Sequence, residues 1–298
     1  MSGMFQGAYS FDKSLINWTK KYNIVFIDGV PITATKNGLT TVNMFLDAST
    51  LEFTALTGNV TNSTIHQIVR YFDTCYEEAL IEYEDIPNWN TSKILDMSGL
   101  FKNYKTFNQD ISGWDVSGVI NMESMFEGAE SFNQAIGTWK LFSVTNIKSM
   151  FKGAIIFDSP IDEWAINENR ITITSLEELF YGASRFNNRL DQWDVSCVTN
   201  MNSIFRGASS FNQNVNIWDK KGLTELKYVL TGASSFNKPL DNWDVSSITN
   251  MDFVFQDATA FNQDISNWDV SNTTTMESMF QNCTNFNQFV GKWNVSEV

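Results

Sequence analysis

The chain has 298 residues and a formal net charge of −14, with 20 Lys and Arg residues against 34 Asp and Glu residues. This charge has the wrong sign for a surface that neutralises phosphates, so nucleic acid is not an expected partner. The single histidine and three cysteines leave little material for metal sites, catalytic triads or a dense disulfide framework. A hydrophobic fraction of 43% is enough to form a large core.

Residues 1–18 are predicted to form a partial N-terminal repeat unit, because they hold a Met-and-Phe motif that recurs later and end at Trp18. The first residues have neither a basic segment nor an apolar segment of the secretory type. No run in the chain approaches the roughly 18 to 20 apolar residues that span a bilayer. We therefore expect no signal peptide and no membrane insertion from this chain.

Residues 19–64 interrupt the pattern and are predicted to be an irregular insertion, or else a degenerate pair of repeat units. Residues 24–33 contain two β-branched, apolar runs around Asp28-Gly29, which is typical of a β-hairpin. A helical pattern then begins at Ile65 and continues through Ile68, Tyr71 and Phe72.

A tryptophan-based repeat runs through residues 65–298, which we expect to form about nine consecutive coils of one solenoid. The spacing between successive tryptophans is 25 residues, except for one spacing of 29, where a loop is expected at residues 165–175. These tryptophans are Trp89, Trp114, Trp139, Trp164, Trp193, Trp218, Trp243, Trp268 and Trp293.

Each 25-residue unit is predicted to hold one short helix and one short strand, so the expected fold class is an α/β repeat. Apolar residues at Met122, Met125 and Phe126, followed by Gly128, favour the helix. The segment from Ile111 to Ser117 favours a strand of three or four residues, paired with its neighbours in a parallel sheet at a spacing of about 4.8 Å. One coil cannot bury its own aromatic residues, so stacked coils must share ladders of Phe and Trp. An asparagine that recurs after the first Phe, as at Asn108, is expected to satisfy backbone groups with an inward amide.

The residue after the tryptophan is an aspartate in several units, which places carboxylates at one register of the stack. One interpretation is an acidic stripe that binds a cation or a basic partner. The favoured interpretation is local hydrogen bonding at the end of the predicted strand. The candidate stripe consists of Asp115, Asp194, Asp219, Asp244 and Asp269. No catalytic, cofactor-binding or metal-binding residues are predicted.

Both ends of the sequence lie inside the repeat pattern, and no polar capping unit is recognisable. Either the chain is an excerpt of a longer repeat protein, or its ends pack against other subunits, head to tail or on a scaffold. The candidate assembly residues are Met1, Met4, Phe5, Trp293, Val295 and Val298.

The units, written VTNMxxMFxxAxxFNQxIxxWDVS and seen for example from Val198 to Gln213, resemble those of the BspA-like leucine-rich-repeat (LRR) surface proteins. That family includes bacterial surface lipoproteins and some giant-virus proteins. The resemblance implies an LRR-like solenoid with a noncatalytic role in protein binding or adhesion, at the cell surface, outside the cell or on a virion. The alternative is a structural component of a virion or surface layer, joined to neighbouring subunits through the ends of the solenoid.

Overall fold

The computed structural model describes residues 24–27, 30–34, 60–74, 85–164, 173–218 and 222–298. The chain divides into two compact units, one of Met1–Val60 with Arg70–Tyr83 and one of Thr61–Val69 with Glu84–Val298. The predicted partial repeat at 1–18 lies outside the described residues, as does most of the loop expected at 165–175.

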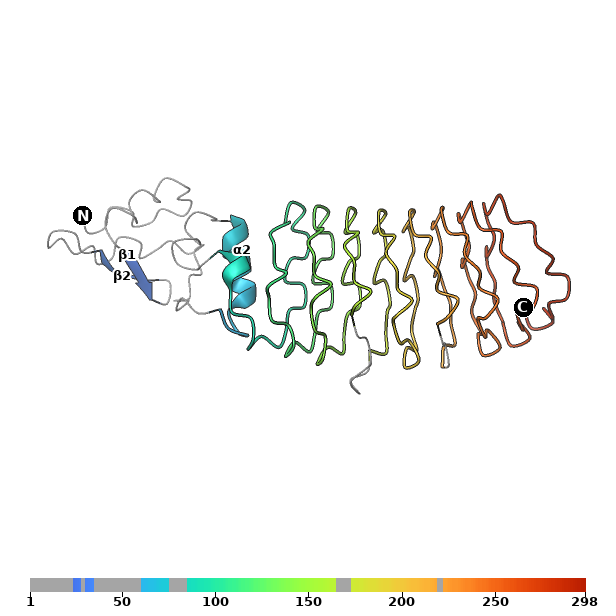
Figure 1. Ribbon diagram of the computed structural model, residues 1–298, viewed down its shortest axis with the longest axis horizontal. Coiled ribbons are helices and arrows are strands. Elements are labelled where there is room, and N and C mark those ends of the chain that lie inside the picture. The colour runs from blue at the N-terminus through green and yellow to red at the C-terminus, as the bar shows by residue number, and fades with distance from the viewer. Residues whose placement is uncertain (1–23, 28–29, 35–59, 75–84, 165–172, 219–221) are drawn as a thin grey trace. The chain divides into compact units, whose positions relative to one another are not determined.

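In the first unit, strand β1 (Ile24–Ile27) pairs antiparallel with strand β2 (Val30–Ala34), where the sequence predicts a hairpin (Figure 1). The register places Ile24 opposite Ala34 and Ile27 opposite Val30, with an irregularity between Val25 and Phe26. The connecting Asp28 and Gly29 are outside the described residues.

Helix α2 (Ile65–Thr74) lies where the sequence predicts a helix, and it buries Ile65, Ile68 and Phe72. This i, i+3, i+7 spacing gives the helix one apolar side. The 3-10 helix η1 (Ile86–Asn88) follows, and its first backbone N–H donates to the carboxylate of Asp85 at 3.0 Å. None of the helices within the described residues is long and apolar enough to cross a bilayer.

The described residues between 85 and 298, which we call the repeat array, form units that lie side by side in chain order (Figure 1). Backbone hydrogen bonds join each unit to the next one. The N–H of Met97 donates to the carbonyl of Asn121 at 2.9 Å, and the N–H of Met122 donates to the carbonyl of Asn146 at 2.8 Å. Isolated parallel bridges, such as Asn121 with Asn146, occur at the same register.

The short helix predicted in each unit is wrong, because η1 is the sole helical element described within the repeat array. The segment from Met122 to Ala129 instead makes successive turns, with Ser124 in the left-handed region at φ 56°. Left-handed residues reorient the peptide planes, so alternate N–H groups, such as those of Ser124 and Phe126, donate to the next unit. A helix would direct all of them along its own axis.

The strand predicted around each tryptophan is also wrong. One turn closes with Trp114 N–H donating to Ile111 at 3.1 Å, and the next closes with Val119 N–H donating to Val116 at 3.0 Å. Only Asp115 lies between these turns, which leaves no room for a paired strand. The LRR-like solenoid with a continuous parallel sheet therefore stays a prediction.

The core of the array consists of stacked aromatic side chains. Within one unit, the rings of Phe151 and Phe157 lie 3.9 Å apart, and Phe157 stacks on Phe186 of the next unit at 6.0 Å. The indole N–H of Trp164 donates to the carbonyl of Ile136, 28 residues earlier, at 3.0 Å. A buried indole needs such a partner, and seven other tryptophans of the array make the same kind of bond to a preceding unit.

The recurring asparagine satisfies backbone groups as predicted, but from an exposed position rather than an inward one. The Oδ1 of Asn108 accepts from the backbone N–H of Asn133 at 2.9 Å, and the Oδ1 of Asn187 accepts from that of Asn212 at 2.9 Å. Asp158 occupies the same register in one unit and accepts from Asn187 at 2.8 Å. An oxygen acceptor is therefore what this position requires.

Candidate functional site

The predicted acidic stripe lies at exposed positions of the array. Asp115, Asp194, Asp244 and Asp269 each follow a buried tryptophan and are themselves exposed, whereas Asp219 lies outside the described residues. Within the described residues, no group of three or more His, Cys, Asp and Glu side chains is arranged to hold a metal ion. The stripe as a binding surface stays a prediction.

Each described aspartate of the stripe has a local hydrogen-bonding role. The Oδ1 of Asp115 accepts from the backbone N–H of Ser117 at 3.0 Å and from its hydroxyl at 2.6 Å. Asp244 makes the same two bonds to Ser246, at 3.0 and 2.7 Å. Hydrogen bonds from Ser117 lower the pKa of the Asp115 carboxyl below its ordinary value. These contacts are those of the favoured interpretation, in which the aspartate stabilises a turn.

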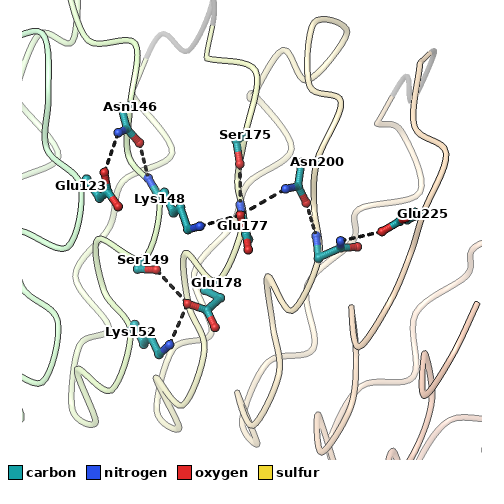
Figure 2. A network of polar contacts seen from close by, with 11 residues as sticks. Glu123, Asn146, Lys148, Ser149, Lys152, Ser175, Glu177, Glu178, Asn200 and Glu225 are labelled. Atoms are coloured by element: carbon teal, nitrogen blue, oxygen red, sulfur yellow. Dashed lines mark hydrogen bonds and ion pairs between the residues drawn. The ribbon is translucent and has the colours of Figure 1, made fainter. Parts of the chain in front are cut away.

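A second polar surface lies on the segment of successive turns. We call residues 121–128 and the matching residues of the other units the turn face. Figure 2 shows polar contacts that cross several units of this face. The amide of Asn146 donates to Glu123 at 3.0 Å, the ammonium of Lys148 contacts Glu177 at 2.8 Å, and the amide of Asn200 donates to Glu177 at 3.2 Å (Figure 2).

The acids at the centre of this network are compensated by neighbouring groups. Burial raises the pKa of the Glu178 carboxyl, but hydrogen bonds from Lys152 and Ser149 outweigh it, so that pKa lies below its ordinary value. The bonds measure 2.7 Å from Lys152 Nζ and 3.0 Å from Ser149 Oγ (Figure 2). The hydrogen bond to Glu177 raises the pKa of the Lys148 ammonium. The two central glutamates, Glu177 and Glu178, are thus each paired with a lysine within the turn face.

Next to the network lies a cluster that the sequence analysis missed. The guanidinium carbon of Arg206 is 4.4 Å from the ring centroid of Tyr228 and 5.3 Å from that of Tyr181. Tyr228 in turn stacks on Phe253 at 4.7 Å, and Lys227 Nζ lies 5.3 Å from the Tyr228 centroid. The available signal was the replacement of small residues by aromatic ones at a repeated register: Ser124, Ser149 and Ser203 give way to Tyr228 and Phe253.

The candidate assembly residues are only partly within the described chain. Trp293 is half-buried, and Val295 and Val298 are 52% and 56% exposed. Met1, Met4 and Phe5 lie outside the described residues. A role of these residues in assembly stays a prediction.

The residues most often used in catalysis have structural contacts here. Nε2 of His66 lies 2.9 Å from the carbonyl oxygen of Ser98. Cys283 is buried, its thiol donates to the carbonyl of Ala258 at 3.1 Å, and burial raises the pKa of that thiol to about 11. A thiol with so high a pKa is a poor nucleophile at neutral pH.

Comparison with known proteins identifies a family for this chain. None of the curated proteins matches the chain. Among solved structures, a leucine rich cell surface protein from Faecalibacterium prausnitzii A2-165 is similar at 14% identity and a TM-score of 0.22, over 68% of this chain and 84% of that one. One family model matches residues 66–173, 167–243 and 215–298, which is most of the chain, and its description names no activity. The chain therefore belongs to the repeat family described as Mycoplasma protein of unknown function, DUF285.

Proposed function

We propose that the chain is a noncatalytic, surface-exposed repeat protein that mediates protein binding or adhesion, built on an LRR-like solenoid. The observation that carries this proposal is a contrast between columns of the repeat array, where a column is the set of residues at one register of successive units. The column of Phe132 in the core repeats one residue type, whereas a column of the turn face, buried or half-buried on the same backbone, holds chemically different side chains in different units.

The contrast is clearest at the turn face. The column of Phe132 holds phenylalanine in every described unit, and its rings stack at 5.9 to 6.1 Å. The column of Ser124 holds glycine, serine, glutamate, tyrosine or phenylalanine, although its backbone keeps a φ between 51° and 60°. A regular scaffold thus presents a non-repeating set of side chains, which is how repeat proteins recognise protein partners.

The resemblance of the units to BspA-like proteins supports the surface location and the adhesive role. An antibody against residues 85–298, applied to intact and to permeabilised cells that carry the gene, tests the location. We expect labelling of intact cells. Labelling only after permeabilisation would contradict the proposal, and labelling confined to virus particles would favour the structural alternative instead.

Beads coated with the purified chain test the binding role. We expect them to attach to target cells, and we expect protease treatment of those cells to abolish attachment because the partner is a protein. Beads coated with heat-unfolded chain are the matched control. Equal attachment of both bead types would contradict a role that depends on the folded array.

A further inference from the structure

We propose that Tyr181, Arg206, Lys227, Tyr228 and Phe253 form a docking site for an acidic, aromatic-containing peptide segment of a protein partner. We call these five residues the arginine–tyrosine patch. The inference rests on the proposed binding function and deepens it, because it names the surface and the chemistry of the partner.

The first feature of the patch is the position of Arg206. The guanidinium group of Arg206 lies over the rings of Tyr181 and Tyr228, which belong to the units before and after it. Within the described residues, its N–H groups donate to no acceptor and no carboxylate lies within ion-pair distance. Arginine stacked on rings in this way is held in place while its N–H edge stays available for a carboxylate.

The second feature of the patch is the positive charge of Arg206 and Lys227. Lys102, Lys105, Lys148 and Lys152 of the array each contact a glutamate at 2.7 to 2.8 Å. Lys227 and Arg206 make no ion pair within the described residues, and they differ from other such cations (Lys93, Lys140, Arg185, Lys238 and Lys292) in lying together over the ring of Tyr228. Two uncompensated cations therefore stand together in a chain of net charge −14. An acidic group on a partner is the complement that these cations lack.

The third feature of the patch is the backbone conformation of Tyr228 and Phe253. Tyr228 and Phe253 have φ values of 59° and 60°, a left-handed conformation that is costly for bulky residues. Other units place Gly99, Ser124 or Ser203 at this register. Two large rings in adjacent units, both half-buried and 4.7 Å apart, bring no buried core packing to offset this cost. Residues held in such conformations gather at binding sites, and Tyr and Arg are typical of binding hot spots.

The repeat itself supplies substitutions that the backbone accepts. Tyr228→Ser and Phe253→Ser introduce the residue of Ser203, and Arg206→Gln introduces the residue of Gln256 and Gln281 at the same register. Arg185→Gln removes the same charge from an exposed position outside the patch and serves as the control. Unchanged near-ultraviolet circular dichroism and melting temperature verify that each variant retains the fold.

The probes are capped ten-residue peptides with Glu-Tyr-Glu between glycine and serine residues, and the same peptides with Gln-Tyr-Gln. Binding to the full chain is measured by fluorescence anisotropy at low and physiological salt. We expect Arg206→Gln and Tyr228→Ser to weaken binding of the Glu peptide at least about tenfold, and Arg185→Gln to change it less than about twofold. Arg206→Gln should not change binding of the Gln peptide, because that peptide has no glutamate to pair with Arg206.

Three results would overturn the proposal: no binding of the Glu peptide to the wild-type chain, equal binding to the patch variants, or binding of an anionic polysaccharide such as polysialic acid at least as tight as that of the peptide. The bead experiment separates the two levels. If the patch variants do not change protease-sensitive attachment, the patch is not the docking site, but the proposed binding function is unaffected. Loss of attachment by the wild-type chain would remove the binding function itself.

Discussion

The interior and the turn face of the repeat array follow opposite rules on one backbone. In the interior, Phe132, Phe157 and Phe186 occupy equivalent places with less than 1% of their surface exposed. On the turn face, equivalent places hold residues as different as Ser203, Tyr228 and Phe253. Packing against the neighbouring unit fixes the residue type of the first set, whereas the second set shares a left-handed backbone but no single residue type. Under the proposed binding function, stability and specificity are carried by separate columns of the same repeat.

The largest effect is expected when the interior ladder is cut. Phe157→Ala removes a ring that stacks on Phe151 within its unit and on two neighbouring units. We expect a loss of about 3–5 kcal/mol in the free energy of unfolding, measured by chemical denaturation. Phe142→Ala, at a position that is 45% exposed, is the control and should cost less than about 0.5 kcal/mol. Equal losses would mean that the ladders are not the core.

The second largest effect is expected when a buried hydrogen bond of a tryptophan is removed. Trp164→Phe keeps a ring but leaves the buried carbonyl of Ile136 without its indole donor. An unsatisfied buried acceptor costs about 1–3 kcal/mol, so we expect a loss of that size in thermal or denaturant unfolding. Trp293→Phe is the control, because it removes the same kind of indole hydrogen bond at a half-buried position where water can replace the donor. A loss as large at Trp293 would show that ring size rather than the hydrogen bond matters.

The third prediction tests the backbone that both regions share. Gly182 has φ 71°, and a Cβ there would have ordinary contacts, the nearest at 3.7 Å. Gly182→Ala should therefore cost about 1–2 kcal/mol through its left-handed backbone alone. Gly182→Asn should cost less, because asparagine tolerates this region and Asn103 and Asn282 already occupy the register. The denaturation midpoints of the two variants give the order directly, and an alanine variant as stable as the wild type would contradict the assignment.

The fourth prediction concerns the exposed asparagine column. Asn187 accepts from Asn212 N–H at 2.9 Å and from Gln213 Nε2 at 3.0 Å. Asn187→Ala should cost about 0.5–1.5 kcal/mol, the usual contribution of such bonds. Asn187→Asp keeps the oxygen acceptor, as Asp158 does in the preceding unit, and should be nearly neutral at pH 7. Destabilisation by both variants to the same extent would mean that the amide N–H₂ is required.

The smallest effect is a pH dependence from the aspartate column. Hydrogen bonds from serines lower the pKa values of Asp115, Asp194 and Asp269 in the folded state. Their stabilisation is thus present above the unfolded-state pKa near 4 and is lost as pH falls through the lower folded-state values. The triple Asn variant should match the wild type at pH 7 and lose less stability below pH 4, as measured by melting temperature. Asn90 makes the same turn to Ser92, so asparagine fits the register.

The interior was predictable and the local backbone was not. The ladders of Phe and Trp follow from spacing alone, because a period of 25 residues that repeats apolar types can be buried only by stacking. The spacing of Met122, Met125 and Phe126 equally suits a helix and a row of turns. The left-handed conformation of Ser124 distinguishes the turns from a helix, and a serine does not predict that conformation. One unit does place a glycine, Gly99, at that register, but a single glycine among eight units does not reveal a conformation that all of them share.

The arginine–tyrosine patch was hidden from the sequence for a related reason. Tyr181, Arg206 and Tyr228 belong to three different units and to two registers, and they meet because the units stack. A search that averages the repeat treats them as departures from the consensus. The acidic stripe was visible because it agrees with the consensus, and its four described members, Asp115, Asp194, Asp244 and Asp269, bond to the serine two residues later.

The 29-residue spacing between Trp164 and Trp193 has a consequence for protein engineering. The two indoles still stack at 6.3 Å, and Trp193 still donates to the carbonyl of Ile161 at 3.1 Å, as if the four additional residues were absent. The array therefore tolerates a longer spacing between these two tryptophans while the ladders on either side keep their register. A foreign loop, such as an epitope or a protease site, can be grafted there with little expected cost to folding.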